Sequence, residues 1–430
     1  MSRGVAVVGV GQSKQAKKRE VTIAALVREA VDGALADAEL TFGDIDAIVL
    51  AKTPDLFDGV MNPELYLADA IGARGLPVTR VFTGGSVGGH AAIYAAHLIQ
   101  ARLAGRVLVV AYSKESEGNF TWALSRPLPF SAQLGAGAGG HFAPVIREYI
   151  RRSHAPEHIG WQVAVNHRLN ATRNPYAHIH KPDITIEEVR NSPMLWDPIR
   201  FLESCPSSDG SCAVVISSEM HARLAPRPPA WIHGTGWRTE TGHFAGRDEV
   251  NPRAGQECAA AAYREAGITD PGTEVDVSEL YIPYSWYEPM WMENIGLAPE
   301  SSGWRAVDEG HTAFGGRHPI NPSGGVLSGN PTGATGLLRF AEAALQVRGL
   351  AGEHQVDGAR RAIGHAMGGA SQFHALGWWE VRNHERSTRT PCRTRRAGRY
   401  PDDEPPAPEK CPVHQHGQPI RRGLGRDRPR

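Results

Sequence analysis

The chain of 430 residues is 41% hydrophobic and 21% charged, which is typical of a globular protein with room for two or three packed units. Its 46 Lys and Arg residues balance 46 Asp and Glu residues. Bulk charge therefore favours neither nucleic acid nor an anionic membrane as a partner.

Strands and helices alternate in the first part of the chain. Apolar residues on one helical face predict helices at 22–40 and 89–103. This alternation implies right-handed crossovers and a largely parallel sheet between layers of helices. The strands themselves are predicted from short, Val-rich apolar runs at residues 4–10, 46–52, 77–83 and 106–112.

Residues 120–205 interrupt this alternation. They contain a Gly/Ala-rich turn, a helix at 144–153 with Pro144 suited to its first turn, and a His- and Asn-rich helix at 163–178. A strand resumes only at 211–217. Such a long excursion predicts an inserted loop domain within an N-terminal half of residues 1–225. Three polar side chains of the second helix either line a ligand channel or, as we expect, face solvent: His167, Asn170 and Asn174.

The second half repeats the style of the first. A strand at 231–237, a helix at 255–266 and a strand from Asp276 precede a Gly-rich turn that leads into a long amphipathic helix. Two strands around a Gly-Gly turn then close the fold. The repetition predicts duplicated α/β halves, the second covering residues 226–385.

The remaining residues, 386–430, differ in composition. They carry 12 Lys and Arg residues against 5 Asp and Glu residues and have few aliphatic side chains. A segment of this kind buries too little apolar surface to fold, so we expect a disordered basic tail.

Cysteine usage and the absence of long apolar runs indicate the cellular compartment in which the protein works. The five Cys residues include no C-x-x-C pair, as is usual in a reducing environment. No apolar run of about 18 residues occurs, and the first residues lack the apolar segment of a signal peptide. We expect a cytoplasmic protein that contacts no membrane.

The turn VFTGGSVGGHAA, residues 81–92, follows a predicted strand and opens a predicted helix. Phosphate-binding loops, nucleophile elbows and catalytic thiol loops all occur at such turns. The sequence has no P-loop signature, and GVGQSK at Gly9 lacks the third Gly of a dinucleotide-binding motif. Residues 84–88 match G-x-S-x-G with Ser86 as nucleophile, but duplicated halves do not fit a hydrolase fold.

Six motifs taken together decide among these possibilities. In order and spacing they resemble the thiolase superfamily, and most of all the sterol-carrier-type thiolases and bacterial lipid-transfer proteins that act on steroid side-chain thioesters. The resemblance spans residues 5–381 and implies a thiolase-like α/β/α/β/α fold of two similar halves, with an inserted loop domain, in a homodimer. The motifs are GGSVGGHA, NHRLNATRNP, SDGSCAVV, ELYIPYSWYE, GGVLSGNPTGATG and GHAMGG.

The resemblance also shows where this chain departs from the family. Thiolases carry a nucleophilic Cys in a loop of the form C-x-S-G-x-x-A, and matching that motif places Gly85 at the Cys position. The His of the family's G-H-P motif, which polarises a thioester carbonyl, is replaced by Asn330. The aromatic position of a third motif is Tyr284, followed by Tyr287, and His365 stands before the last Gly-Gly turn.

These departures favour a lyase over an acyltransferase. Thiolysis needs a thiolate that holds the acyl group, whereas retro-aldol cleavage of a β-hydroxyacyl thioester needs a base and donors for the enolate. A Tyr base would need a nearby positive charge or donated hydrogen bonds, because a free phenol titrates near about pH 10. The predicted base is Tyr284, Tyr287 or His365, and the predicted donors are Asn330 and the backbone around Gly85, Ser86, Gly368 and Gly369.

The sequence thus predicts an aldolase that cleaves a β-hydroxyacyl-CoA with a steroid or other lipid side chain. Coenzyme A enters as part of the substrate, and no cofactor or metal is expected. The resemblance implies a small partner protein with a zinc ribbon and an OB-fold. Two alternatives stay open: a non-catalytic acyl-CoA- or lipid-binding subunit, and an acyltransferase with an unrecognised nucleophile such as Ser86.

Overall fold

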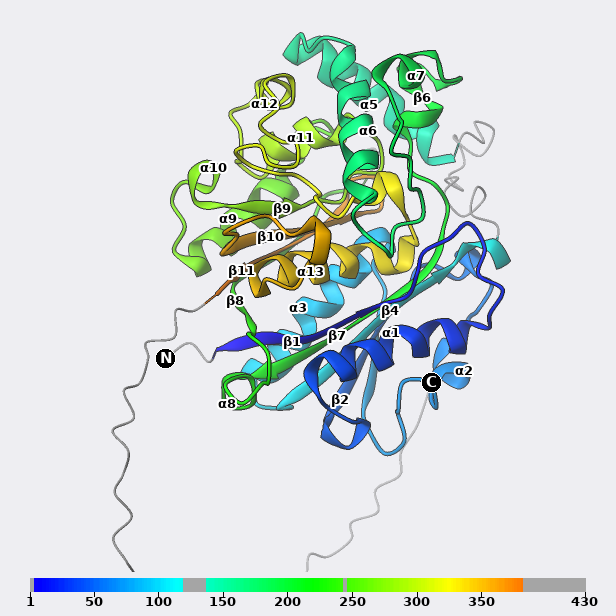
Figure 1. Cartoon of the computed structure of the whole chain (residues 1–430), viewed down its shortest axis with the longest axis vertical. Coiled ribbons are helices and arrows are strands. Elements are labelled where there is room, and N and C mark those ends of the chain that lie inside the picture. The colour runs from blue at the N-terminus through cyan, green and yellow to red at the C-terminus, as the bar shows by residue number, and fades with distance from the viewer. Residues whose placement is uncertain (1–3, 119–136, 243–245, 382–430) are drawn as a thin grey trace, which may run out of the picture. The chain divides into compact units, whose positions relative to one another are not determined.

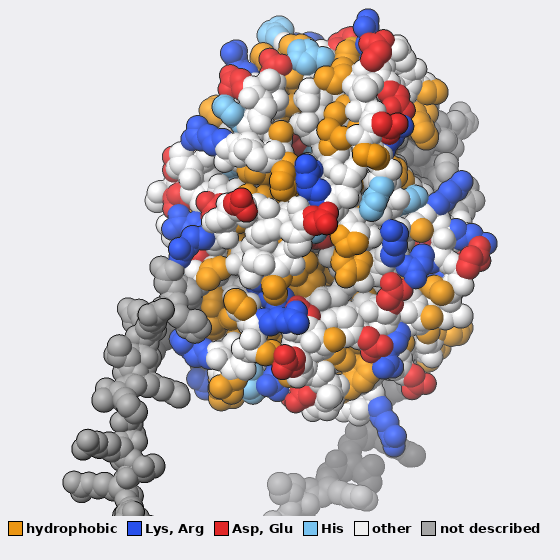
Figure 2. All heavy atoms as spheres, viewed as in Figure 1, with side chains coloured by type: hydrophobic (Ala, Val, Ile, Leu, Met, Phe, Trp, Pro, Cys, Tyr) orange, Lys and Arg blue, Asp and Glu red, His pale blue; other side chains and the backbone are white. Residues whose placement is uncertain are grey.

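The computed structural model describes residues 4–118, 137–242 and 246–381. The predicted tail at 386–430 and the first part of the predicted insertion lie outside these residues. No described helix is long and apolar enough to cross a membrane. On the face shown in Figure 2, basic and acidic side chains are interspersed rather than gathered by sign.

Nine strands form one sheet in the order β3-β2-β4-β7-β1-β8-β11-β10-β9 (Figure 1). Each lies at or close to a run that the sequence marks as apolar. Their bounds are β1 Val5–Gln12, β2 Ala47–Ala51, β3 Val78–Val81, β4 Arg106–Lys114, β7 Asp209–Ser218, β8 Ala230–Thr239, β9 Val277–Glu279, β10 Arg361–Gly368 and β11 Phe373–Glu380.

The sheet is mixed, and the expectation of a largely parallel sheet was wrong. Strand β2 pairs in parallel with β3 and β4, and β9 pairs in parallel with β10. The other five pairings are antiparallel. The reason is that each half closes with a strand, β7 or β11, that returns beside the strand where its half began, β1 or β8.

The predicted duplication is confirmed by this order. From the junction of β1 and β8, the first half runs β1-β7-β4-β2-β3 and the second runs β8-β11-β10-β9. In both halves, the strand that comes first along the chain lies beside the strand that comes last. The next-to-last strand along the chain is the next neighbour in the sheet. The described part of the second half has no counterpart of β3, because the chain after β9 forms helices α11 (Tyr287–Asn294) and α12 (Gly303–Asp308) and irregular segments instead.

Helices form five layers with the two halves of the sheet. Helix α1 (Ile23–Ala38), which begins after the N-cap Thr22, covers the outer face of the first half. Helix α9 (Arg253–Ala266) covers the outer face of the second half. Between the halves lie α3 (Val87–Gln100) and α13 (Thr332–Arg348), whose side chains join one shared core (Figure 1).

The two central helices pack at backbone distance. A Cβ added at Gly88 would lie 2.2 Å from the Leu337 backbone nitrogen, and one at Gly336 would lie 3.0 Å from the Gly89 nitrogen. The expected amphipathic character of α13 was wrong, since all its residues except Leu345 are buried. A helix with sheet halves on two sides and α3 on a third has almost no face left for solvent.

The inserted segment packs on the second half. Helix α5 (Gly137–Ser153) and α6 (His158–Ala171) contribute side chains to the same core as α9 and α11. Helix α5 begins seven residues before Pro144, so the expectation that this Pro stands in the first turn was wrong. Short α7 (Ile186–Asn191) and the hairpin β5 (Met194–Trp196) and β6 (Ile199–Arg200) complete the described part.

The close contact of α3 with α13 predicts a large cost for one added methyl group. Gly88→Ala should lower the free energy of unfolding by about 3 kcal/mol, because its Cβ meets backbone that no rotamer change can move. Urea unfolding measures this. Gly43→Ala is the matched control, with its nearest atom 3.6 Å away, and should change stability by less than about 0.5 kcal/mol. Equal effects of the two changes would contradict the packing argument.

Candidate active site

The turn at residues 84–86 meets the Gly-Gly turn after β10. A Cβ added at Gly368 would lie 2.7 Å from the Gly85 nitrogen and 2.6 Å from the Ser86 nitrogen. A Cβ at Gly84 would lie 3.5 Å from the Gly369 nitrogen. Only Gly at position 368 lets these two backbone amides at the start of α3 approach the strand so closely.

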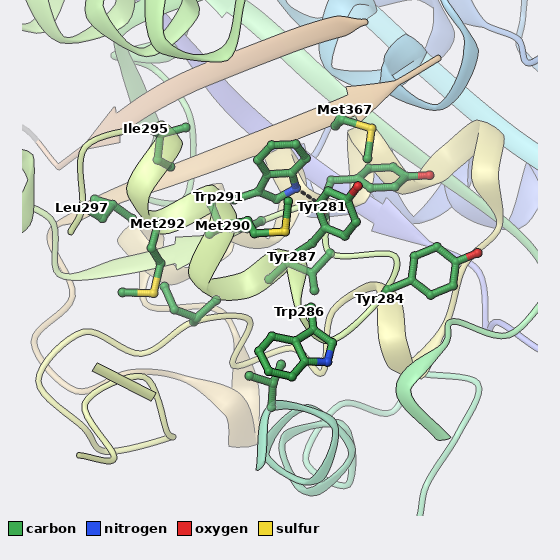
Figure 3. Close-up of a cluster of buried hydrophobic side chains, with 14 of the residues drawn as sticks. Tyr281, Tyr284, Trp286, Tyr287, Met290, Trp291, Met292, Ile295, Leu297 and Met367 are labelled. Carbon is green, nitrogen blue, oxygen red and sulfur yellow. Dashed lines mark hydrogen bonds between the residues drawn. The ribbon is translucent and has the colours of Figure 1, made fainter. Parts of the chain in front are cut away.

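The missing side chain of Gly85 would face a phenol. A Cβ added there would lie 3.0 Å from both the Tyr281 hydroxyl and the Met367 carbonyl oxygen. Figure 3 shows Tyr281 and Met367 beside each other at the rim of the aromatic cluster. Tyr281 therefore borders the space toward which a side chain at position 85 would point, and leaves little room for it.

Local hydrogen bonds hold Tyr281 just beyond β9. The Asn321 side chain takes the place of a neighbouring strand, since its Oδ1 accepts from the Leu280 nitrogen at 2.6 Å and its Nδ2 donates to the Leu280 oxygen at 3.0 Å. The Trp291 indole donates to the Tyr281 carbonyl at 2.8 Å. Burial raises the pKa of Tyr281 well above its ordinary value, and Cys205 and Glu115 act in the same direction.

Ser86 is committed to the backbone. Its side chain is fully buried, and its hydroxyl donates to the Thr83 carbonyl oxygen at 2.9 Å. His90 contacts the Ser86 carbonyl oxygen through Nδ1 at 3.1 Å, and not the hydroxyl. The turn thus uses Ser86 to order its own backbone at the start of the helix.

Tyr284 and Tyr287 point to different surroundings. Tyr284 pairs with Ser204 as an isolated bridge, and its ring lies 5.6 Å from that of Phe142. Its hydroxyl points away from the other side chains drawn in Figure 3. Burial raises the pKa of Tyr284 above its ordinary value, and Cys205 adds to this effect.

Tyr287 lies deeper, 4.9 Å from the Trp291 ring between centroids. Its hydroxyl makes no hydrogen bond of ordinary length and angle to the described residues. Burial raises its pKa well above the ordinary value, and the nearby Ser371 hydroxyl offsets part of that shift. Both phenols are consequently neutral near pH 7.

Asn330 immediately precedes the N-terminus of α13, and its side-chain amide lies between Thr335 and Cys205. Its Oδ1 lies 2.8 Å from the Thr335 hydroxyl, which also lies 3.0 Å from the Pro331 carbonyl oxygen, and its Nδ2 donates to the Cys205 sulfur at 3.3 Å. The Asn330 backbone nitrogen donates to the Ser208 hydroxyl at 3.1 Å. One of the two Nδ2 hydrogens meets a weak sulfur acceptor, which leaves capacity for a stronger oxygen acceptor.

Cys205 is half-buried beside this amide. Its backbone nitrogen donates to the Pro283 oxygen at 3.0 Å, which ties it to the segment that carries Tyr284. Burial raises the pKa of the Cys205 thiol to about 12, and Glu115 contributes, whereas the Asn330 amide opposes the shift. A thiol with this pKa is protonated at neutral pH and is a poor nucleophile.

His365 belongs to a separate group. Its Nε2 lies 3.5 Å from Nδ1 of His374, and the Trp291 ring makes edge-to-face contacts with both imidazoles. Burial lowers the pKa of His365 well below its ordinary value, and His374 acts in the same direction. No described hydrogen bond joins this pair to Gly85, Tyr281 or Asn330.

The polar residues of α6 and of the turn after it are buried, so the expectation that they face solvent was wrong. His167 is fully buried and lies 2.6 Å from the Glu288 carboxylate. Asn170 and Asn174 are also buried and donate to the carbonyl oxygens of Asn321 and Ser323. These two hydrogen bonds hold the irregular segment that precedes α13.

The structure thus pairs Gly85 with Tyr281 and Asn330 with Cys205, and the effect of Cys205 on the pKa of Tyr281 links the two pairs. Of these four residues the sequence motifs singled out Gly85 and Asn330. Tyr281 lies within the ELYIPYSWYE motif, and its signal is its position directly after a strand. Cys205 gave no signal, because only the folded chain brings it to Asn330. In the part of the chain that the structure describes, no group of three or more His, Cys, Asp and Glu side chains could hold a metal.

Sequence comparison places the chain in a family. A profile described as thiolase C-terminal domain-like matches residues 236–376. Human sterol carrier protein 2 is 30% identical over 392 residues, covering 85% of this chain and 70% of that protein. The chain belongs to the thiolase superfamily. An acetyl-CoA acetyltransferase of Methanothermobacter thermautotrophicus is also 30% identical over 374 residues, covering 85% of this chain and 97% of its own.

Among solved structures, this thiolase-superfamily chain resembles the Ltp2–ChsH2 aldolase, with a TM-score of 0.77 and 24% sequence identity. The match covers 88% of this chain and 98% of that one. Human mitochondrial 3-ketoacyl-CoA thiolase also matches, with a TM-score of 0.67 and 16% identity over 88% of this chain and 98% of that one, which confirms the thiolase-like fold. The relatives include enzymes and lipid carriers, so membership alone does not fix the reaction.

The surroundings of Cys205 predict that its thiol is alkylated slowly in the folded protein. At pH 8, iodoacetamide should modify Cys205 of the folded protein at least about 100-fold more slowly than the same Cys in urea, because a pKa of about 12 leaves little thiolate. Mass spectrometry of the Cys205 peptide gives both rates. Fast modification of the folded protein at neutral pH would contradict a neutral thiol.

Proposed function

We propose that this protein is an aldolase that cleaves the carbon–carbon bond of a β-hydroxyacyl-CoA without a covalent acyl intermediate. One observation carries the proposal: Gly85, matched by motif to the family's nucleophilic Cys, faces the Tyr281 phenol. The space that a thiol would occupy is bordered by a group that transfers protons but cannot hold an acyl group as a thioester. The neighbouring Cys205 has the protonated thiol of a poor nucleophile.

The reaction divides into two tasks. The β-hydroxyl loses its proton to a base, the bond between Cα and Cβ breaks, and its electron pair forms the thioester enolate. Cβ leaves as a ketone or aldehyde, and Cα then takes up a proton to give a shortened acyl-CoA. The enzyme must therefore move a proton at the β-oxygen and stabilise negative charge at the thioester oxygen.

Asn330 suits the second task. Its Nδ2 points to Cys205 and holds a hydrogen that meets only sulfur, so a thioester oxygen would be a better partner. The position before the α13 N-terminus adds the positive end of a helix dipole. The amides of Gly85 and Ser86 at the start of α3 supply a second group of donors.

Tyr281 suits the first task, in preference to the predicted Tyr284, Tyr287 and His365. Its hydroxyl would lie 3.0 Å from a Cβ at Gly85. Its raised pKa makes the phenolate scarce at neutral pH but strongly basic when it forms, which matches a weakly acidic alcohol. The positive charge of Arg339 opposes this rise in the pKa of Tyr281, but burial outweighs it.

Relatives support an acyl-CoA enzyme of this kind and a partner. The structurally similar Ltp2–ChsH2 is an aldolase that contains a second protein, ChsH2. By analogy we propose that a small protein with a zinc ribbon and an OB-fold assists this chain, and that the chain forms a homodimer. The similarity to sterol carrier protein 2 keeps one alternative, a carrier that binds acyl-CoA or lipid without turnover.

Tyr281→Phe should lower kcat/KM for cleavage of a β-hydroxyacyl-CoA at least about 100-fold, because it removes the proton acceptor. Assays with and without the partner protein follow the ketone or aldehyde and the shortened acyl-CoA. Tyr263→Phe is the matched control, a buried phenol that donates to the Ile295 oxygen at 2.7 Å away from the site. This control should lower the free energy of unfolding by about 1 kcal/mol and leave the rate of turnover unchanged.

Tyr284→Phe and Tyr287→Phe are assayed beside these variants. A loss larger in either of them than in Tyr281→Phe would move the base to that residue. Binding without turnover under every condition would overturn the aldolase and favour the carrier.

The pH profile tests the phenol directly. Because the pKa of Tyr281 lies well above its ordinary value, kcat/KM should rise about tenfold per pH unit between about pH 6 and 9 without a plateau. Initial rates in buffers of constant ionic strength measure this slope. A plateau above about pH 7 would identify a carboxylate or imidazole as the base instead.

A further inference from the structure

The carboxylate of Glu115 joins three chain segments beside Asn330. Its Oε1 accepts from the Thr332 nitrogen at 2.7 Å, and its Oε2 accepts from the Ser207 hydroxyl at 2.7 Å and the Ser208 nitrogen at 3.2 Å. The Ser113 hydroxyl also donates to Oε1, at 3.3 Å. One side chain thus ties the end of β4 to the segment after Cys205 and to the N-terminus of α13.

Ser208 extends this connection to Asn330. While its backbone nitrogen donates to Glu115, its hydroxyl accepts from the Asn330 nitrogen at 3.1 Å. Glu115 therefore holds the residues on both sides of the Asn330–Cys205 contact: Thr332 follows Asn330 by two positions, and Ser207 follows Cys205 by two. A shift of either segment would turn the Asn330 amide away from the sulfur.

Burial of this charge is expensive and has no ionic compensation. Glu115 is buried, and within the described residues no Lys, Arg or His forms an ion pair with it. Two other buried carboxylates of the same core region have such partners, Glu279 with Arg339 and Glu342 with His354. Burial raises the pKa of Glu115 to about 7, against the effect of its hydrogen bonds.

The hydrogen-bond pattern requires a carboxylate in particular. The donors from Thr332 and Ser208 are backbone amides, which cannot reverse, and they approach different oxygens. A Gln side chain of the same shape has one oxygen and one NH₂ group, so it must leave one of the two amides facing a donor. Replacing the oxygen therefore disturbs one of the two segments that hold Asn330.

From this geometry we infer that Glu115 is a positioning residue, which sets the direction of the Asn330 amide relative to Cys205 and Tyr281 by holding the chain on both sides of it. Glu115 holds Asn330 through these hydrogen bonds, and its charge, in addition to burial, raises the pKa values of Tyr281 and Cys205. The inference deepens the proposed function and rests on it for the role in cleavage, but not for the role in orientation.

A double-mutant cycle on cleavage tests the role in catalysis. Glu115→Gln should lower kcat/KM by about 10- to 100-fold, and Asn330→Ala by a similar factor. In the double variant the two losses should fall short of their product by at least about fivefold, because Glu115 works through Asn330. Losses that multiply fully would overturn the inference.

Glu293→Gln is the matched control. Glu293 also accepts two backbone nitrogens, from Ser301 and Gly303, and one phenol, from Tyr149, but it lies beside α12. The control should lower the urea midpoint while kcat stays within about twofold of wild type. If Glu115→Gln likewise changed only the urea midpoint, a purely structural role would replace the positioning role.

A second cycle, on Cys205 alkylation, needs no substrate. Asn330→Ala removes the hydrogen bond to the sulfur and should slow alkylation in the wild-type background. In the Glu115→Gln background, where the amide is no longer directed, that effect should largely vanish. An Asn330→Ala effect of equal size in both backgrounds would overturn the inference. If the wild-type protein cleaves nothing, the proposed function fails, and this cycle still decides the role of Glu115.

Discussion

The contact of α3 with α13 at backbone distance is the constraint on which the other features depend. Glycines at 88, 89 and 336 let two helices cross in the space between the halves of the sheet. The N-termini of both helices then lie near the ends of β4 and β10, and the amides of Gly85 and Ser86 come close to Gly368. The candidate site is built from these helix starts, so its donors are mainly backbone groups and side chains that the backbone fixes.

Burial, more than local charge, sets the pKa values of that site. It raises the pKa values of Tyr281, Cys205 and Glu115 together. A neutral thiol and a neutral phenol favour proton transfer and hydrogen bonding over nucleophilic attack. This agrees with a superfamily member that has Gly85 at the start of α3, and it makes the arrangement of Asn330 more important than any single charge.

Much of the fold follows from patterns in the sequence. Val-rich runs and helical periodicity located most strands and the principal helices, and their repetition indicated two similar halves. The wrong expectations share a physical reason. They concern how helices and strands pack against their neighbours, and not which helices and strands form. The sequence cannot show that β7 and β11 return antiparallel, that α13 has almost no exposed face, or that Asn170 and Asn174 clamp a neighbouring segment.

For the candidate site, the motifs in the sequence predicted Gly85, Asn330 and Ser86, and they contain the glycines that close packing requires. Short-range patterns carry this information because a turn, a helix start and a Gly-Gly pair are local features. Only the tertiary structure decided that Tyr281 borders the space at Gly85, that Cys205 contacts Asn330, and that Glu115 holds both segments. These groups are separated by tens to hundreds of positions along the chain, and only the packing of the central helices between the two halves brings them together.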